Sequence, residues 1–138
     1  FEQIGAPWID GVQLAAALNA RGLAGVRFYP VSFIPQSSKF AGQKCQGVYI
    51  LVTDRRSLRP VRLGLEVAAI LYRLYPDKYR LEEEENLLGS ETVLSQILAG
   101  EDPADIVLTW QADETEWQQL RKRYLLYPES TKLGDTVR

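Results

Sequence analysis

The sequence predicts an α+β fold, a small and mainly antiparallel sheet with helices packed on it. Two stretches rich in β-branched and aromatic residues, 26–34 and 46–53, are typical of strands and follow each other along the chain. One helical pattern precedes them and three follow, which gives the order helix, strand, strand, helix, helix, helix. Because two strands alone are marginally stable, residues 1–7 are a plausible third strand.

The first helix is predicted at residues 12–21. Asp10 has the short polar side chain of an N-cap, and Gln13, three residues later, completes a capping-box pattern. Gly22 occupies the position at which glycine commonly ends a helix. In the lead-in before this helix, Trp8 is large enough to anchor the segment against the core.

A dense apolar stripe predicts a second, core helix at residues 60–75, which starts at a proline and stops before Pro76. Arg62 and Glu66 fall on the opposite face of this helix with i,i+4 spacing. An exposed ion pair is the common use of that spacing, so we expect Glu66 to be solvated rather than to act as a catalytic carboxylate.

Two more helices are predicted towards the C-terminus. Ser90 is expected to cap a short helix that Gly100 ends, and Asp102 with Pro103 starts a longer last helix. Residues at spacings of three and four run along this last helix: Ile106, Trp110, Asp113, Trp117, Leu120 and Tyr124. Its tryptophans are more typical of core or interdomain packing than of a platform for carbohydrate.

Composition narrows the possible functions. The 138 residues carry a net charge of −2, which gives no basic excess for nucleic acid or an anionic membrane. The absence of histidine removes the usual general base and the commonest metal ligand. The single cysteine, Cys45, cannot form an internal disulfide and is more typical of a small buried side chain than of a reactive thiol. We therefore expect no metal, no cofactor, no nucleic acid and no membrane span.

The loop between the two strands, residues 35–45, carries the candidate binding residues. A tight hairpin needs only about two to five residues, and a longer loop between good strands is often functional. Its hydroxyl, cationic, aromatic and amide side chains suit a polar ligand such as a sugar. With neighbouring strand residues, the candidates are Tyr29, Ser37, Ser38, Lys39, Phe40, Gln43, Cys45 and Gln46. An idle loop is the alternative, and it should lack the hydrogen bonds that would hold a site loop in place.

Several motifs, in order along the chain, resemble one family. They are Ile4-Gly-Ala-Pro-Trp8, Gly25-Val-Arg-Phe28, Ser38-Lys-Phe-Ala-Gly42 with Cys45-x-Gly47-Val48, Arg59-Pro-Val-Arg62 and Tyr124-Leu-Leu-Tyr127. On these residues the chain resembles the C-terminal portion of the exo-acting β-N-acetylmuramidases of the NamZ type, formerly known only as a domain of unknown function. The resemblance covers residues 1–127, which we expect to form a single α+β domain. The tail at 128–138 matches no family motif and is expected to be loose.

The resemblance implies one part of a two-domain bacterial enzyme. In the family, a larger N-terminal Rossmann-like domain carries the glutamate thought to be catalytic, and the smaller C-terminal domain closes the cleft. These enzymes release N-acetylmuramic acid from the non-reducing ends of peptidoglycan fragments. By this resemblance the chain is the smaller domain, holds no catalytic residue and is inactive alone. The substrate class implies a periplasmic or extracellular location.

Side-chain chemistry suggests roles for the loop within such a cleft. Lys39 could pair with the lactyl carboxylate of muramic acid, and Phe40 or Tyr29 could stack on a sugar ring. The hydroxyl and amide groups of the loop could bond sugar hydroxyls or the acetamido group. Two other interpretations stay open: a stand-alone module that binds cell wall or another protein, and a purely structural domain.

Overall fold

The chain forms two compact units. The structure, a computed structural model, describes residues 2–37, 39–84 and 88–127. Its units are Phe1–Ile106 and Val107–Arg138, named below the core unit and the C-terminal unit, and each is described by itself. Among the helices in the described part of the chain, none has both the length and the apolar character that a membrane span requires. The 128–138 tail, predicted to be loose, lies outside the described residues.

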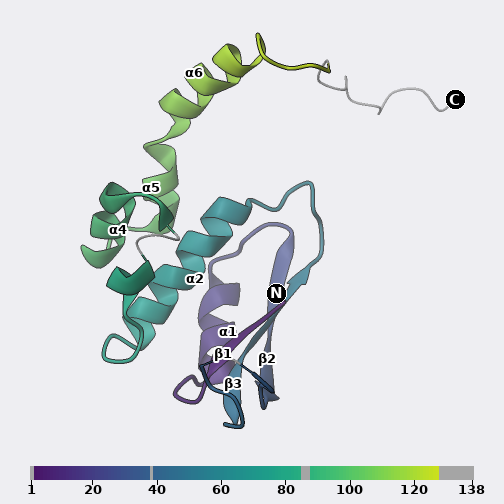
Figure 1. Cartoon of the computed structure of the whole chain (residues 1–138), viewed down its shortest axis with the longest axis vertical. Coiled ribbons are helices and arrows are strands. Elements are labelled where there is room, and N and C mark those ends of the chain that lie inside the picture. Colours follow the sequence, from purple (N-terminus) through teal and green to yellow (C-terminus); the bar gives the residue numbers. More distant parts are fainter. Residues whose placement is uncertain (1, 38, 85–87, 128–138) are drawn as a thin grey trace, which may run out of the picture. The chain divides into compact units, whose positions relative to one another are not determined.

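Three antiparallel strands make the sheet of the core unit, in the spatial order β1-β3-β2 (Figure 1). Their bounds are Gln3–Ala6 for β1, Val26–Phe33 for β2 and Cys45–Val52 for β3. In the central strand, Val48 is paired with Ile4 on one side and with Pro30 on the other. The third strand predicted within residues 1–7 is therefore present, and the predicted α+β fold is confirmed.

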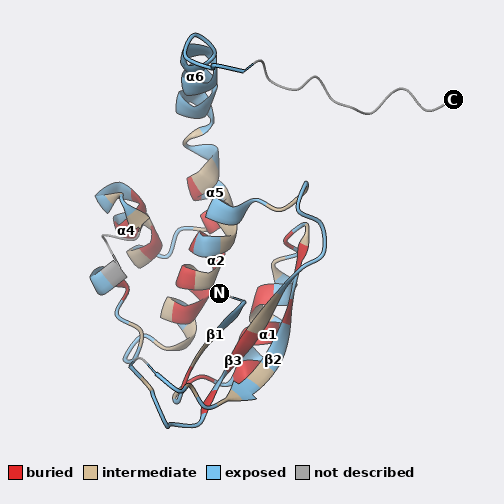
Figure 2. Cartoon of the chain, turned by 45° about the vertical axis from the view of Figure 1, so that its right-hand side comes forward, coloured by how far each residue is buried: buried red, intermediate tan, exposed pale blue. Residues whose placement is uncertain are grey.

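The core lies between one face of this sheet and two helices. Helix α1 (Gly11–Ala20) contacts β2 and β3, and helix α2 (Pro60–Leu74) contacts α1. Figure 2 shows the buried residues concentrated on these helices and on the strands that they cover. The buried cluster comprises Ala6, Ile9, Leu14, Ala15, Leu18, Leu23, Val26, Phe28, Val48, Ile70 and Leu71. The observed bounds of both helices, and of β2 and β3, lie within one residue of the predicted ones.

The start of α1 shows how the lead-in is held. The Asp10 side chain accepts hydrogen bonds from the backbone N–H groups of Val12 (2.9 Å) and Gln13 (3.0 Å), which confirms the predicted N-cap. The reciprocal half of a capping box does not form, because the Asp10 backbone N–H donates to the hydroxyl of Tyr75 (3.0 Å). At the other end of the helix, Gly22 has the positive φ of 62° predicted for the residue that ends it.

Glycine allows α1 to approach the sheet closely. A Cβ atom on Gly11 would lie 2.6 Å from the carbonyl oxygen of Gly47, a distance that real Cβ atoms do not reach. The helix can therefore start directly against the backbone of β3, and the side-chain carbonyl of Gln46 accepts the Gly11 N–H at 3.5 Å. This contact sets where the lead-in with Trp8 lies.

Glu66 is not the exposed residue that its spacing predicted. Its side chain is only 1% exposed and accepts hydrogen bonds from Arg21 at 2.6 and 3.1 Å and from Arg62 at 3.3 and 3.4 Å. Arg21 stands at the C-cap of α1 and also bonds Asp102 (2.5 Å). The i,i+4 spacing correctly paired Glu66 with Arg62, but it could not reveal a second guanidinium arriving from another helix. Two charged partners offset the cost of burying the carboxylate.

The remaining helices begin as predicted, but the last one is divided. Helix α4 (Glu91–Leu98) is capped by Ser90 and followed by Gly100 at a φ of 82°, and Asp102 accepts the Ala104 N–H at the start of α5 (Pro103–Leu108). A short 3-10 turn, η1 (Leu81–Glu84), was not predicted.

The single long helix expected after Asp102 is instead two helices, α5 and α6 (Gln111–Arg121). Between them the Trp110 N–H donates to Val107, three residues back, which is the tighter spacing of a 3-10 turn. β-Branched Val107 and Thr109 near this point disfavour a continuous α-helix, and a periodic pattern of apolar residues does not detect such a break.

Candidate functional site

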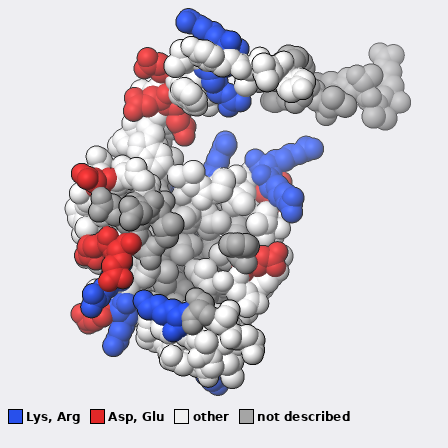
Figure 3. Space-filling model, in the orientation of Figure 1, with Lys and Arg blue, Asp and Glu red and all other residues white. Residues whose placement is uncertain are grey.

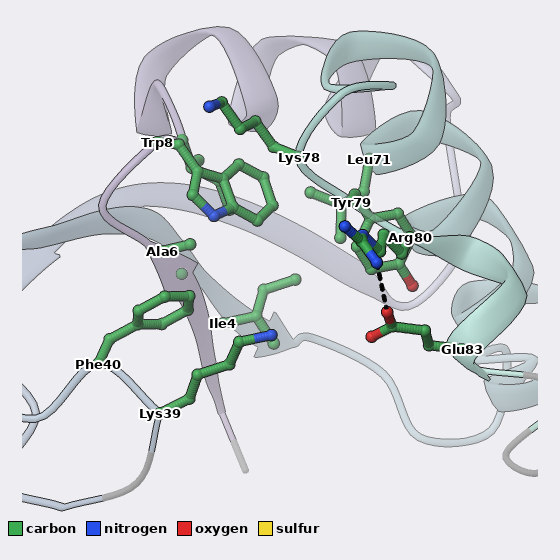
Figure 4. Close-up of a pocket in the computed structure, with 12 residues that line it drawn as sticks. Ile4, Ala6, Trp8, Lys39, Phe40, Leu71, Lys78, Tyr79, Arg80 and Glu83 are labelled. Atoms are coloured by element: carbon green, nitrogen blue, oxygen red, sulfur yellow. Dashed lines mark hydrogen bonds and ion pairs between the residues drawn. The ribbon is translucent and has the colours of Figure 1, made fainter.

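A pocket of about 490 Å³ opens in the core unit, within the size range of small-ligand sites. Three segments far apart in sequence form it: β1 with the lead-in after it, the loop between β2 and β3, and the end of α2 with the chain after it (Figure 4). The pocket is lined by Ile4, Gly5, Ala6, Trp8, Ile9, Lys39, Phe40, Leu71, Lys78, Tyr79, Arg80 and Glu83.

Trp8 forms one aromatic wall of the pocket, and Tyr75 holds it in place. Its ring meets that of Tyr75 edge-on, with centroids 5.3 Å apart and planes at 61°. The Tyr75 hydroxyl accepts the Asp10 N–H and donates to the Asp10 carbonyl oxygen (3.3 Å), so the end of α2 holds the lead-in in place. The prediction that Trp8 anchors this segment is confirmed, since it packs against the core cluster.

Phe40 forms a second aromatic wall of the pocket and packs against the same cluster (Figure 4). Two backbone hydrogen bonds hold its loop, from Gly42 to Pro35 (2.9 Å) and from Gln43 to Phe40 (3.1 Å). Gly42 has a φ of 74°, a conformation that L side chains rarely adopt, so glycine is needed for this turn. The loop therefore has the internal hydrogen bonds expected of a site loop.

Charge at the pocket is predominantly positive, with Lys39, Lys78 and Arg80 against Glu83. Arg80 and Glu83 form an ion pair at 3.3 Å, and both side chains are exposed. In the described part of the chain, neither lysine lies within ion-pair distance of a carboxylate. The Lys39 ammonium lies 5.8 Å from the centroid of the Phe40 ring, within reach of a cation–π contact. Two lysines without a carboxylate partner among the described residues, in a pocket that is also lined by aromatic side chains, suit an anionic ligand that contains a ring.

The structure brings two of the predicted binding residues, Lys39 and Phe40, into this pocket. Tyr29 lies elsewhere, 52% exposed on the sheet, where it is paired with Tyr49 of β3. Ser37 is an exposed loop residue, and the Ser38 prediction falls outside the described residues.

Of the other three candidates, the side chains of Cys45 and Gln46 have partners within the fold. Cys45 is fully buried, as its small apolar character predicted, and its thiol donates to the carbonyl oxygen of Gln43 (3.6 Å). The side chain of Gln43 is exposed, and that of Gln46 accepts the Gly11 N–H.

Several lining residues were missed by sequence reasoning. Lys78, Tyr79 and Arg80 follow α2 as a basic and aromatic triplet, and two hydrogen bonds to the Tyr75 carbonyl oxygen, from the N–H groups of Lys78 (3.0 Å) and Tyr79 (2.9 Å), shape this turn. The basic and aromatic triplet itself was the sequence feature that could have identified these residues as candidates. Its position opposite a loop nearly forty residues earlier depends on how α2 packs, which the sequence pattern does not express. No cluster of potential metal ligands occurs among the described residues.

The fold and the pocket together define a small α+β domain whose ligand-sized site has aromatic and cationic walls. The chain belongs to the family described as "Exo-beta-N-acetylmuramidase NamZ, C-terminal", whose model matches residues 1–127. The family resemblance noted in the sequence motifs is thereby confirmed.

Two relatives agree with this assignment. The chain is 34% identical over 130 residues to the peptidoglycan β-N-acetylmuramidase NamZ of Bacillus subtilis (strain 168), which covers 92% of this chain and 31% of that protein. It also resembles the crystal structure of a DUF1343 family protein from Bacteroides fragilis, with a TM-score of 0.77 and 25% identity over 91% of this chain and 35% of that one. The chain thus spans about a third of the length of each relative.

Proposed function

We propose that this chain is the substrate-contacting domain of a peptidoglycan exo-β-N-acetylmuramidase, and that its pocket binds the muramic-acid sugar. The observation that carries the proposal is the meeting of Lys39, Phe40 and Trp8 in one pocket of a domain from this family. The name of the Bacillus subtilis relative, a peptidoglycan β-N-acetylmuramidase, supports the same substrate class.

The chemistry of the pocket fits the features that distinguish muramic acid. A pyranose ring has apolar C–H faces, which suit the aromatic walls formed by Trp8 and Phe40. The lactyl ether adds a carboxylate that glucosamine lacks, and Lys39 is a cation over the Phe40 ring with no carboxylate partner in the described residues. A charge-assisted hydrogen bond from Lys39 would therefore select muramic acid over glucosamine.

The cleavage step is assigned to the other part of the parent protein. Glycoside hydrolysis generally needs two carboxyl groups placed about 5–10 Å apart across the scissile bond. The pocket offers one carboxylate, Glu83, and Arg80 already pairs with it. The catalytic glutamate then belongs to an N-terminal Rossmann-like domain of the same protein, and this chain supplies one wall of the cleft. A peptidoglycan substrate places the protein in the periplasm or outside the cell.

The test is a comparison of ligands in the full-length protein. Lys39→Ala should weaken the binding of N-acetylmuramic acid about tenfold or more, because a charge-assisted hydrogen bond contributes about 1.5–3 kcal/mol. Binding of N-acetylglucosamine should change little. Lys44→Ala is the matched control, since Lys44 is an exposed lysine of the same loop that does not line the pocket. Isothermal titration calorimetry would measure both dissociation constants.

An equal loss of affinity for both sugars would show that Lys39 does not recognise the lactyl carboxylate. An NMR titration of this chain with a muramic acid–glucosamine disaccharide adds a second readout. Amide shifts should gather at residues 35–47 and at Lys78–Arg80, while the ligand stays intact. Cleavage of the disaccharide by this chain alone would contradict the assignment of the catalytic group to another domain.

A further inference from the structure

The C-terminal unit displays an apolar stripe that its described residues, 107–127, leave exposed. Along α6 and the residues after it, Trp117 is 61% exposed, Leu120 41% and Tyr124 74%. Their spacing of three and four residues places them on one side of a helical path. None of the residues of α6 is buried, and Figure 2 shows the helix entirely in the colour of exposed residues. Leu126 and Tyr127 extend the exposed apolar surface.

A helix of this kind needs a surface to pack on. α6 has 11 residues, and isolated helices shorter than about 12–15 residues are marginal in water. Its charges do favour a helix, because Asp113 and Glu114 stand in the first turn and Arg121 in the last, complementing the helix dipole. Figure 3 shows acidic side chains at one end of α6 and basic ones towards the other. The stabilisation from these charges is small compared with the free-energy cost of exposing a tryptophan, a leucine and a tyrosine in one stripe.

The family comparison indicates what covers the stripe. The family model reaches residue 127, so the stripe belongs to the part of the chain that is shared with the family. The model is described as C-terminal, and the chain spans only 31% and 35% of its two relatives. The larger, N-terminal part of those proteins therefore precedes the matched region. We propose that α6 docks on this N-terminal part of the parent protein, with Trp117, Leu120 and Tyr124 as the apolar contacts.

The charge pattern argues against a membrane as the occupant. Helices that lie on anionic membranes are typically rich in lysine and arginine along their whole polar face. α6 instead begins with acidic residues, which anionic lipid would repel. Mixed charges around an apolar stripe are typical of a protein interface with a polar rim. The inference rests on family membership and on α6, and it holds or fails independently of what the pocket binds.

The experiment compares the isolated chain with the full-length protein by hydroxyl-radical footprinting and mass spectrometry. In the isolated chain, Trp117 and Tyr124 should be labelled at the rate of exposed residues. In the full-length protein, their labelling should fall at least fivefold. Equal labelling in both proteins would overturn the proposal.

Two adjacent substitutions show whether the apolar stripe causes the protection. In the full-length protein, Leu120→Glu places a charge on the stripe and should return Trp117 to the labelling rate of the isolated chain. Gln119→Glu adds the same charge one residue away, off the stripe, and keeps the acceptor for Lys122, so it should leave Trp117 protected. Protection that survives Leu120→Glu would overturn the proposal.

Protection that is already present in the isolated chain would also overturn it. Such protection would indicate a second copy of the chain if it grew with protein concentration. If it were independent of concentration, it would indicate a contact within the chain itself. Circular dichroism of the Leu120→Glu variant, expected to match the parent spectrum in the isolated chain, checks that the core unit is still folded.

Discussion

Helices α1 and α6 have nearly the same length, 10 and 11 residues, but they differ in how far their apolar side chains are buried. In the core unit, Leu14 and Leu18 of α1 are fully buried against the sheet. In the C-terminal unit, Trp117 and Leu120 of α6 stay largely exposed. Periodic apolar residues thus specify that a helix has a face to bury, but the surface that accepts this face must come from elsewhere in the protein.

The largest difference in stability should appear when one aromatic residue in each unit is replaced by alanine. Phe28→Ala removes a side chain that is 3% exposed in the core and should lower the free energy of unfolding by about 3–5 kcal/mol. Trp117→Ala in the isolated chain should leave the denaturation midpoint nearly unchanged, because most of this side chain is already exposed. Urea denaturation followed by far-UV circular dichroism measures both. A comparable loss in Trp117→Ala would mean that α6 is packed within this chain.

A somewhat smaller effect should come from the buried ion network. Glu66→Gln leaves Arg21 and Arg62 facing a neutral amide and should lower the free energy of unfolding by about 3 kcal/mol. This value is at the lower end of the range for broken buried ion pairs, because both arginines are partly exposed. Arg21→Met should cost more than Arg62→Met, since its contacts to Glu66 are shorter. The same denaturation experiment gives the ranking, and the reverse order would contradict it. Glu114→Gln in exposed α6 is the matched control and should leave the midpoint unchanged.

The smallest effect concerns the pH dependence of stability and the Asp102 carboxylate, which Arg21 contacts. The hydrogen bond from Arg21, and then that from the Ala104 backbone N–H, holds the pKa of Asp102 below its ordinary value. A lowered pKa in the folded state means that Asp102 stabilises the fold above its unfolded pKa of about 3.9, and that this contribution is lost as the pH falls through the folded value. Asp102→Asn should therefore flatten the fall in unfolding free energy as the pH drops below about 4. Parallel pH profiles for the two proteins would refute this role.

Much of the fold could be predicted because its signals are local. Asp10, Ser90 and Asp102 cap helices where their short polar side chains predicted it, and Gly22 ends α1. The break between α5 and α6 was missed because it depends on a weak local preference at Val107 and Thr109 that the stronger periodic pattern masked.

The candidate site was only half predictable. Lys39 and Phe40 were chosen because a long loop between two strands offered a cation and a ring, and both line the pocket. Trp8, Lys78 and Arg80 complete the pocket from other segments. Nothing in their own neighbourhoods marked them as partners of the loop, because proximity between distant segments depends on how β1 and α2 pack.

The sequence by itself determined most of the helices and strands, the helix caps, the α+β class and the family, since each depends on residues close together along the chain or on motifs in order. Only the tertiary structure decided that Glu66 is buried, because Arg21 reaches it from α1. It also decided that Lys39 and Lys78 share a pocket and that no residue of α6 is buried. The physical reason is the same throughout: burial and electrostatic pairing depend on which surfaces meet, and the spacing of residues along one helix or strand does not encode the surface of its neighbour.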